Sequence, residues 1–297
     1  MTTRRTFIAQ SLRGLCLLGS GMSPVIEAFA GNQPVPGLTV LISSDTQSQL
    51  HPFPGDAPKY AGLGGYEARA AYIASQRLQS SPFLLLDSGD FIQGSPSLDI
   101  YKGKIEIEAM NRMRYDAVCL GEHEADAGIP TLIQSLSLAH FPVISSNAAD
   151  ERFSALLQPH CVIQKNALRV GIMAINRSDG FLKVKGDPVT VANEKAEELR
   201  RHFGCRLVIC LSRLGLDERD VINDEYLARN SEGIDLIAGG YSHRVLTHPL
   251  RFYNRKKREI LVTGSGWGGT HLSRVEYEIS GAKKIFSGKA QTVEIGK

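Results

Sequence analysis

Four short apolar segments, each followed at once by polar side chains, are the feature of the sequence that most constrains the fold. Residues 38–42, 83–86, 117–120 and 234–238 have the composition of buried strands. The polar groups that follow them include Asp45, Gln47, Asp87, Asp90, Glu122, His123, Asp126, Tyr241 and His243. In open α/β sheets, groups at the carboxyl ends of strands converge even when they are far apart in the sequence. The pattern therefore predicts one site built from several strand ends, of a kind that suits hard divalent metal ions.

Helix-like segments separate the strand-like ones. Helical periodicity is expected over residues 66–79, 105–113, 131–139, 191–202 and 219–228, and further strands over residues 143–144, 168–175 and 207–211. After residue 267 the pattern changes to consecutive strands at 272–279 and 291–295, which predicts an antiparallel end to the chain. Residues 31–297 show no repeat, linker or low-complexity tract after about position 36, so they are expected to form one α/β domain.

A glycine-rich segment at residues 264–269 has the spacing of a dinucleotide-binding loop and follows a strand-like run. The residues that come next, 272–277, have the pattern of another strand and not of a helix. A pyrophosphate is bound by the amides and dipole of a helix N-terminus. A tight loop is therefore predicted here, without a dinucleotide.

The first thirty residues differ in kind from the rest. Arg4 and Arg5 precede a mildly apolar stretch at residues 15–20, and the Ala-Phe-Ala sequence at 28–30 fits a cleavage site of small residues. This order of features predicts a twin-arginine signal peptide over residues 1–30 and export to the periplasm. A frayed amphipathic terminus and an uncleaved anchor are the alternatives.

Charge and hydropathy argue against two classes of partner. Cleavage after residue 30 would leave 31 basic and 30 acidic residues, because the removed segment holds three arginines and one glutamate. A near-neutral chain lacks the positive face that nucleic-acid binding needs, and a hairpin turn between two strands explains the basic run 255–258. No later segment has the ~20 apolar residues of a membrane span. We expect no nucleic-acid partner, and no membrane span after signal removal.

Four cysteines would remain after cleavage: Cys119, Cys161, Cys205 and Cys210. Cys119 and Cys210 lie within apolar strand-like runs, where a thiol usually acts as a small buried hydrophobe. Disulfides are permitted outside the cytoplasm, yet the sequence does not pair these residues, and their spacing is not that of a zinc site.

These ordered segments resemble the catalytic domain of the 5'-nucleotidase branch of the calcineurin-like metallophosphoesterases, over nearly the whole chain after the signal segment. The motifs are SDTQSQL at 44–50, GG at 64–65 with AR at 68–69, LDSGDFIQGSP at 86–96, IEAMN at 107–111, YDAVCLGEHEAD at 115–126, PVISSN at 142–147, LSRLG at 211–215 and GGYSH at 239–243. The resemblance implies an α/β fold, a layered αββα sandwich of two mixed sheets flanked by helices, with two metal ions above the strand ends. The family's C-terminal domain, which clamps the nucleoside base, is expected to be absent, so nucleotide specificity does not transfer.

The resemblance also implies roles for individual residues. The first metal would be held at the positions of Asp45, Gln47, Asp90 and His243, and the second at those of Asp90, Glu122, Arg213 and Tyr241. Two such metals, bridged by one carboxylate, would bind the phosphate and activate a water molecule. His123 and Asp126 match the pair that stabilises the leaving group in the family, and an imidazole with a carboxylate partner can act as a general acid.

Four of these positions depart from the family pattern. Gln47 stands at a His position, Glu122 at an Asn position, and Arg213 and Tyr241 at His positions. Glu122 is a suitable oxygen ligand and Gln47 a weak neutral one. Arg213 cannot ligate a metal and its fixed charge repels one, while a phenol with a pKa near ~10 is a poor ligand at neutral pH. The second metal site is therefore expected to be lost and the first to be weakened.

One hypothesis is an exported pseudoenzyme. Arg213 would occupy the vacated second-metal position and pair with Glu122 and Asp90. The former cleft would then bind a small anion or a periplasmic protein, and His123 would be a structural remnant.

The alternative is a divergent hydrolase of phosphoesters or related esters that uses Arg213 in place of the second metal. One divalent ion, Mn, Zn or Fe, would be held by Asp45, Asp90 and His243, completed by Gln47 or His51. A third possibility, an accessory protein of a periplasmic redox or sulfur pathway, depends on the export route alone.

Overall fold

The strand-like runs form two mixed sheets in the computed structural model, which describes residues 35–79, 82–93, 100–216, 221–280 and 284–296. These residues belong to one unit, Pro34–Lys297. The predicted signal peptide, residues 1–30, lies outside the described residues. Across the described ranges, no helix combines the length and the apolar character that crossing a membrane would require.

The first sheet contains the three predicted strands nearest the N-terminus that are followed by polar residues. Its strand order is β13-β12-β1-β2-β3-β4-β5. Five of its strands run parallel and therefore end at the same edge: β1 (Val35–Ser43), β2 (Phe83–Asp87), β3 (Ala117–Cys119), β4 (Val143–Ile144) and β5 (Leu157–Gln158). β12 (His271–Ser280) is antiparallel both to β1 and to β13 (Lys284–Glu294). The predicted antiparallel end of the chain is thus confirmed.

The second sheet has the order β10-β11-β9-β8-β7-β6. Its parallel centre consists of β7 (Leu168–Ile175), β8 (Leu207–Ser212), β9 (Leu236–Gly239) and β11 (Glu259–Gly264). The antiparallel strands β6 (Cys161–Lys165) and β10 (Leu250–Tyr253) form its two edges. The basic run 255–258 lies between β10 and β11, as the predicted hairpin turn requires.

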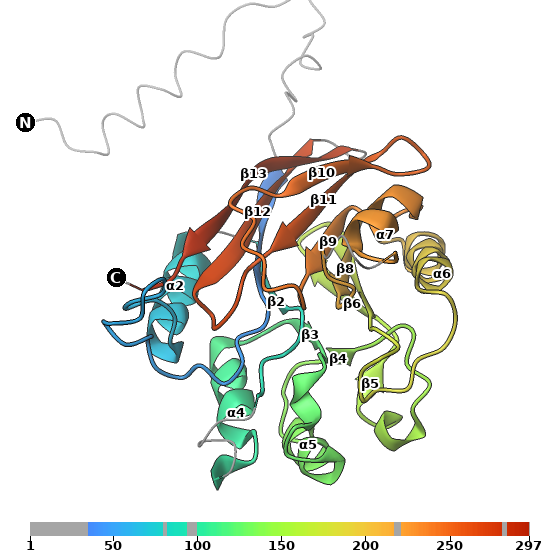
Figure 1. Cartoon of the computed structure of the whole chain (residues 1–297). Helices are drawn as coiled ribbons and strands as arrows, with labels where there is room; N and C mark the ends of the chain where they lie inside the picture. Colours follow the sequence, from blue (N-terminus) through green and yellow to red (C-terminus); the bar gives the residue numbers. More distant parts are fainter. Residues whose placement is uncertain (1–34, 80–81, 94–99, 217–220, 281–283, 297) are drawn as a thin grey trace, which may run out of the picture. The chain divides into compact units, whose positions relative to one another are not determined.

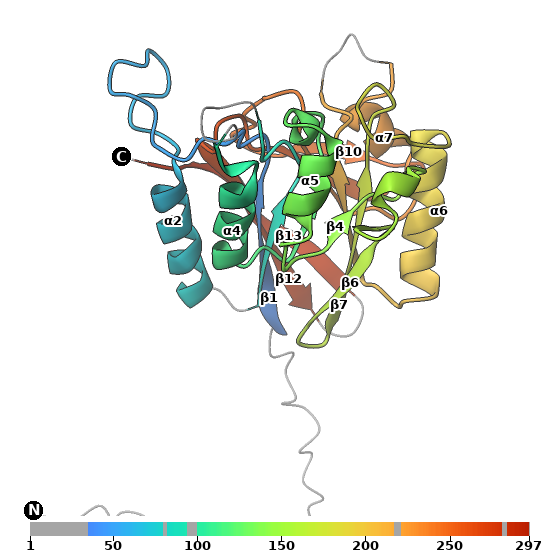
Figure 2. The same ribbon diagram turned by 90° about the horizontal axis from the view of Figure 1, so that it is seen from below.

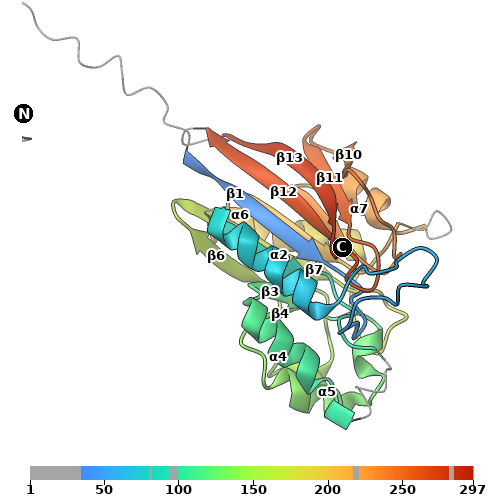
Figure 3. The ribbon, with the colours of Figure 1, turned by 90° about the vertical axis from the view of Figure 1, so that its left-hand side faces the viewer.

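Helices cover the outer face of each sheet, so the layers run helix, sheet, sheet, helix (Figures 1, 2 and 3). The first sheet carries α2 (Tyr66–Gln79), α4 (Lys104–Met113) and α5 (Ile129–Leu136), and the second carries α6 (Pro188–Arg201) and α7 (Asp224–Asn230). Two 3-10 turns complete the elements, η1 (His123–Ala125) and η2 (Glu151–Phe153). The predicted αββα sandwich is confirmed.

Alternation along the strands places the core. In β1, Val40 and Ile42 point to the interior between the sheets, while Leu41 points to the helices on the other side. β8 behaves in the same way, with Ile209 between the sheets and Val208 against α6 and α7. Because both faces of the parallel strands are buried, their sequences are continuous apolar runs.

Capping residues explain why two helices start elsewhere than predicted. α6 begins at Pro188, before predicted residue 191, because the Asp187 side chain caps it by accepting the Thr190 N–H at 2.8 Å. α7 begins at Asp224, later than predicted residue 219, because Asn223 caps it by accepting the Tyr226 N–H at 2.9 Å. The edge strands β5 and β6 were not predicted.

The structure also tests the predictions for the glycine-rich segment and for the cysteines. β12 follows the glycine-rich segment 264–269, so the strand predicted there is confirmed. The four described cysteines are free thiols, and Cys119 and Cys210 are fully buried in β3 and β8, as predicted.

Candidate functional site

Loops at the ends of five parallel strands bring the predicted polar residues together. Asp45 follows β1, Asp90 follows β2, and Glu122 follows β3 in the first sheet. Arg213 follows β8 and Tyr241 follows β9 in the second sheet. The site therefore lies where the strand ends of the two facing sheets meet, as the strand-end pattern predicts.

Arg213 occupies the centre of this site, and its side chain is 0% exposed. Nη1 donates hydrogen bonds to Asp45 Oδ1 at 3.0 Å and to the Ser88 carbonyl at 3.0 Å. Nη2 donates to Glu122 Oε2 at 2.7 Å and to Asp90 Oδ2, and Nε donates to Glu122 Oε2 at 3.2 Å. One guanidinium thus holds three carboxylates that follow three strands of the other sheet. We refer to these four side chains as the Arg213 cluster.

Glycines leave the space that the guanidinium fills. A Cβ at Gly240 would lie 2.5 Å from Arg213 Nη1, and a Cβ at Gly89 would lie 3.1 Å from Arg213 Cδ. A Cβ at Gly121 would lie 2.2 Å from Asp90 Oδ1. These close approaches show that the loop backbones fit tightly around the Arg213 cluster.

Several non-glycine residues of the site adopt left-handed backbone conformations. Asp45, Gln47 and Asp90 have φ values of 51°, 47° and 56°, and Tyr241 and His243 have values of 71° and 52°. Such conformations are disfavoured for L-residues and persist only where the surroundings enforce them. The loops are therefore held in one path that directs the side chains to the centre of the site.

The electrostatics follow from burial and from Arg213. Burial raises the pKa of Asp45 and of Glu122, and the charge of Arg213 opposes that shift in both. Burial alone would lower the pKa of Arg213, but Asp45, Asp90 and Glu122 together hold it well above its usual range. Arg213 is therefore a permanent cation at neutral pH.

Tyr241 packs over the same guanidinium. Its backbone N–H donates to the two carboxylate oxygens of Asp45 at 3.1 and 3.2 Å. The Arg213 guanidinium lies 5.9 Å from the centre of the Tyr241 ring, and the Arg177 guanidinium lies 4.2 Å from it. Arg177 in turn bonds to both carboxylate oxygens of Asp179 at 2.8 and 2.7 Å. The phenol at this position is part of a cation–aromatic stack.

Gln47 is held by a residue that the sequence interpretation did not assign to the site. Trp267 Nε1 donates to Gln47 Oε1, and Gln47 Nε2 lies 3.3 Å from His243 Nε2. His243 Nε2 also lies 3.7 Å from Asp45 Oδ1. Trp267 is the sole tryptophan and stands within the glycine-rich segment 264–269. An isolated aromatic residue among glycines is the sequence signal that could have indicated a role for Trp267 in the site.

His123 and Asp126 lie together at the margin of the Arg213 cluster. Their side chains approach to 3.4 Å between Nδ1 and Oδ2, and the His123 side chain is 41% exposed. The His123 backbone N–H donates to Asp90 Oδ1 at 2.8 Å, which ties η1 to the cluster. The pair is therefore accessible from solvent and close to the Arg213 cluster, and its role stays a prediction.

Another buried carboxylate, that of Asp87, supports the loop beneath the site and was not assigned a role from the sequence. Asp87 accepts the Ser43 hydroxyl at 2.5 Å and the Gly89 N–H at 2.8 Å. Ser43 is also 2.8 Å from the Tyr115 hydroxyl. Burial raises the pKa of Asp87 to about 7. These contacts fix the turn that carries Asp90.

The residues present do not fit a two-metal centre. The carboxylate oxygens that would face the metals are bonded to Arg213, whose charge repels a divalent cation. Nowhere in residues 35–296, outside the undescribed gaps, do three His, Cys, Asp or Glu side chains form a group that could hold a metal ion. His51, the other proposed ligand, lines a separate pocket between α2 and α4. Binding of one divalent metal, or of none, therefore remains a prediction.

Comparison with known proteins identifies proteins that are similar to this chain in sequence and in fold. No protein-family model matches the chain. The snake venom 5'-nucleotidase of Crotalus adamanteus is 30% identical over 224 residues, which are 70% of this chain and 37% of that protein. The structure of a 5'-nucleotidase precursor from Thermus thermophilus matches with a TM-score of 0.79 and 27% identity, over 88% of this chain and 55% of that one.

A third comparison concerns the fold alone. A calcineurin-like phosphoesterase from Bacillus subtilis matches with a TM-score of 0.69 and 20% identity, over 89% of this chain and 91% of that one. The chain spans less than two thirds of the length of the 5'-nucleotidases that it matches. Over the region that it shares with these proteins, the chain belongs to the 5'-nucleotidase branch of the metallophosphoesterase family.

Proposed function

We propose that this protein is a catalytically degenerate member of its family, which no longer performs two-metal hydrolysis and acts as a binding protein. The observation that carries the proposal is the fully buried Arg213 guanidinium, bonded to Asp45, Asp90 and Glu122. Two-metal hydrolysis needs carboxylate oxygens that are open to cations. Here the same oxygens stabilise a fixed internal cation.

Without metals, the chemistry of the Arg213 cluster favours one of the two expected kinds of partner. The Arg213 cluster contains three carboxylates and one guanidinium, so its net charge is negative when the carboxylates are ionised. A small anion would be repelled by that excess charge. We therefore propose a protein partner that contacts the exposed rim formed by His123 and His243.

The divergent hydrolase remains a second candidate because of one observation. His123 and Asp126 keep a geometry in which a solvent-accessible imidazole lies 3.4 Å from a carboxylate. A general acid needs such a pair. This candidate requires that Arg213 release Asp45 and Asp90, which are both nearly fully buried with it.

Export by the twin-arginine route is part of the proposal. It is supported by the N-terminal order of Arg4 and Arg5, an apolar stretch and small residues at 28–30. Fractionation of cells that produce the full chain would test it, with an Arg4→Lys/Arg5→Lys variant as the matched control. A mature periplasmic form that is lost in the control is the expected result, and retention of the wild-type chain in the cytoplasm would contradict it.

The first experiment is metal analysis of the purified, folded protein after dialysis without chelator, together with a screen of phosphoester and thiosulfate-ester hydrolysis. We expect neither stoichiometric Mn, Zn or Fe nor metal-dependent turnover in the wild type. Arg213→His should gain metal, because it removes the fixed charge and restores an imidazole ligand. Arg177→His is the control, since Arg177 stacks on the same tyrosine but bonds to Asp179.

The outcomes separate the two candidates. About one equivalent of metal in the wild type, with turnover lost in Asp90→Asn and His123→Ala, would establish the hydrolase instead. The proposed partner contact is tested by quantitative affinity capture with His123→Arg/His243→Arg as the comparison. A specific protein retained by the wild type and lost from that variant is expected, and an anion that binds the cleft with micromolar affinity would contradict this assignment.

A further inference from the structure

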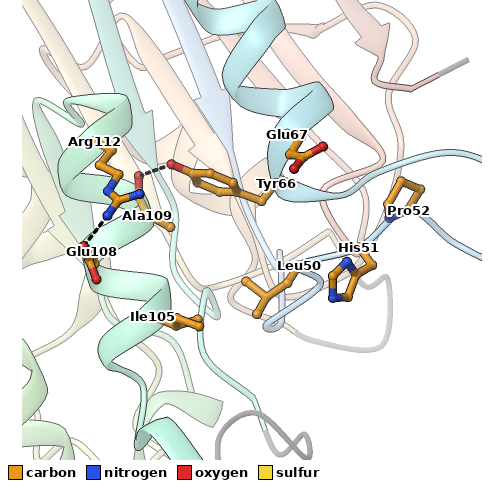
Figure 4. Close-up of a pocket in the computed structure, with 9 residues that line it drawn as sticks. All are labelled: Leu50, His51, Pro52, Tyr66, Glu67, Ile105, Glu108, Ala109 and Arg112. Carbon is orange, nitrogen blue, oxygen red and sulfur yellow. Dashed lines mark hydrogen bonds and ion pairs between the residues drawn. The ribbon is translucent and has the colours of Figure 1, made fainter.

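A pocket of about 430 Å³ lies between α2, α4 and the chain segment 50–52, away from the Arg213 cluster (Figure 4). Leu50, Tyr66, Ile105 and Ala109 give it largely apolar walls. The Tyr66 hydroxyl is satisfied by the Ala109 carbonyl at 3.3 Å. We refer to this cavity as the α2–α4 pocket.

The charged groups at the mouth of the α2–α4 pocket are largely paired with each other. Arg112 and Glu108 form an exposed ion pair of 2.5 Å on α4, and Figure 4 shows both at one side of the opening. An exposed pair of this kind contributes little binding energy to a charged ligand. Glu67 and His51, which also line the pocket, are exposed to solvent, so water screens their charges. A buried polar group would discriminate between ligands more strongly than these exposed ones.

A smaller cavity of about 10 Å³, which we call the inner cavity, shares Leu50 and Ala109 with this pocket as wall residues. Arg69 of α2 and Glu106 of α4 line this inner cavity and are only 5% and 4% exposed. Arg69 Nε and Nη1 and both carboxylate oxygens of Glu106 have no hydrogen-bond partner in the described protein. Buried polar atoms without partners are costly, so these four atoms indicate a guest that bonds to them.

The inner cavity restricts the chemistry of that guest. A space of about 10 Å³ accepts one water-sized group. Arg69 needs a hydrogen-bond acceptor and Glu106 needs a hydrogen-bond donor, so the group must be able to accept and to donate a hydrogen bond. An anionic group would oppose Glu106 and a cationic group would oppose Arg69, because the two side chains already balance each other in charge. A hydroxyl satisfies all of these conditions, and a primary amide satisfies those of charge and hydrogen bonding with a larger head, whereas a phosphate or carboxylate does not.

We propose that the α2–α4 pocket binds a small uncharged amphiphile, whose apolar chain lies against Leu50, Tyr66 and Ile105 and whose hydroxyl or amide head reaches past Ala109 to Arg69 and Glu106. This site is separate from the Arg213 cluster and does not depend on the function proposed for it. Thr46 and Ser48 also line the inner cavity. Ligand binding would therefore stabilise the loop that carries Gln47.

The test uses four six-carbon probes that differ only in the head group: hexan-1-ol, hexanamide, hexanoate and hexylammonium. Binding to the folded protein is followed by titration calorimetry and by the shift in thermal unfolding. Ala109→Leu fills the wall shared by the two cavities, and Ala109→Val is a smaller change that serves if the leucine variant does not fold. Ala74→Leu is the matched control, because Ala74 is exposed on α2 and does not line the pocket.

Saturable binding of hexan-1-ol and hexanamide is expected, with affinity for hexanoate and hexylammonium at least about ten-fold lower. Binding should be lost in the Ala109 variants and unchanged in Ala74→Leu. The proposal is overturned if neither neutral probe saturates, if the charged probes bind as tightly as the neutral ones, or if a folded Ala109 variant binds like the wild type. In the first of these cases the inner cavity holds water alone.

Discussion

Replacement of Arg213 by methionine is the most direct test of the idea that this residue holds the carboxylates of the Arg213 cluster together. Methionine keeps much of the volume and removes the charge and the hydrogen bonds. Asp45 and Asp90, whose side chains are 1% and 2% exposed, would then lose their cation. Breaking a buried ion pair by removal of one partner costs about 3–5 kcal/mol. We expect a loss of that order in the free energy of unfolding at pH 7.5, a large part of the total stability of a typical domain.

The loss should depend on pH in a defined direction. Without Arg213, burial and repulsion by Asp90 raise the pKa of Asp45 and of Glu122 further, because the largest cause that lowers these pKa values has been removed. The native variant then binds more protons than the unfolded chain, so its stability falls as pH rises and recovers as pH falls. The deficit relative to the wild type should therefore be smaller at pH 5 than at pH 7.5.

Urea-induced unfolding, followed by the fluorescence of Trp267 beside the site, would measure both effects. Arg177→Met is the matched control. Arg177 contacts the same Tyr241 ring, but its carboxylate partner Asp179 is mostly exposed. The control should lose about 1 kcal/mol or less. The reasoning fails if Arg213→Met costs no more than this control, or if its deficit is the same at both pH values.

Three further predictions concern residues around the Arg213 cluster. Burial raises the pKa of Asp224 to about 8, so the free energy of unfolding of the wild type should fall as pH rises from 6 to 8. In Asp224→Asn, urea unfolding should show a fall over this pH range that is smaller by roughly 2 kcal/mol. A Cβ at Gly240 would lie 2.5 Å from Arg213 Nη1, so Gly240→Ala should lower the free energy of unfolding by about 1–3 kcal/mol. Gly55 has open space around it, so Gly55→Ala should change that free energy little. Equal effects of the two substitutions would contradict the close fit at Gly240. The fully buried Cys119 thiol should stay unreactive to a disulfide reagent until the protein is unfolded, and rapid modification of the native protein, mapped by mass spectrometry, would count against its burial.

Most of the fold could be predicted because its signals are local. The helix predicted over residues 66–79 and the strand predicted over 168–175 match α2 and β7 residue for residue. Both segments have strong patterns, since α2 buries one face and β7 is apolar along nearly its whole length. β5 and β6 escaped prediction because they are short or half-buried at a sheet edge, where apolar and polar residues alternate weakly.

The site was only partly predictable because its contacts depend on the path of the backbone. The strand-end rule correctly brought Asp45, Asp90 and Glu122 to one edge of the sheet. The pairing of Arg213 with Glu122 and Asp90 is present in the structure, but its bond to Asp45 was not predicted. That bond requires the left-handed turn at Asp45, φ 51°, and such a conformation leaves no clear mark at a non-glycine position.

The four positions that depart from the family pattern form connected contacts in the structure. Glu122 bonds to Arg213, and Arg213 lies under the ring of Tyr241. Gln47 bonds to Trp267 and approaches His243, which in turn approaches Asp45 of the Arg213 cluster. Residues that share partners are coupled in their energies. Changing Arg213 back to histidine alone should therefore leave Glu122 and Tyr241 without the cation that both contact.

That coupling gives a prediction about the route back to metal binding. Arg213→His should bind metal weakly, and the combination with Gln47→His and Tyr241→His, which keeps Glu122 as an oxygen ligand, should bind it more tightly than the separate effects of the three changes suggest. The physical reason is that Arg213→His removes the charge that opposes the cation, while Gln47→His and Tyr241→His replace poor ligands by imidazoles that can bind a metal only when that charge is gone. Metal affinities of the single, double and triple variants, measured by competition with a chelating dye, would reveal the interaction energy. Additive affinities would mean that these positions act independently on the metal, and would contradict the coupling inferred from their shared contacts.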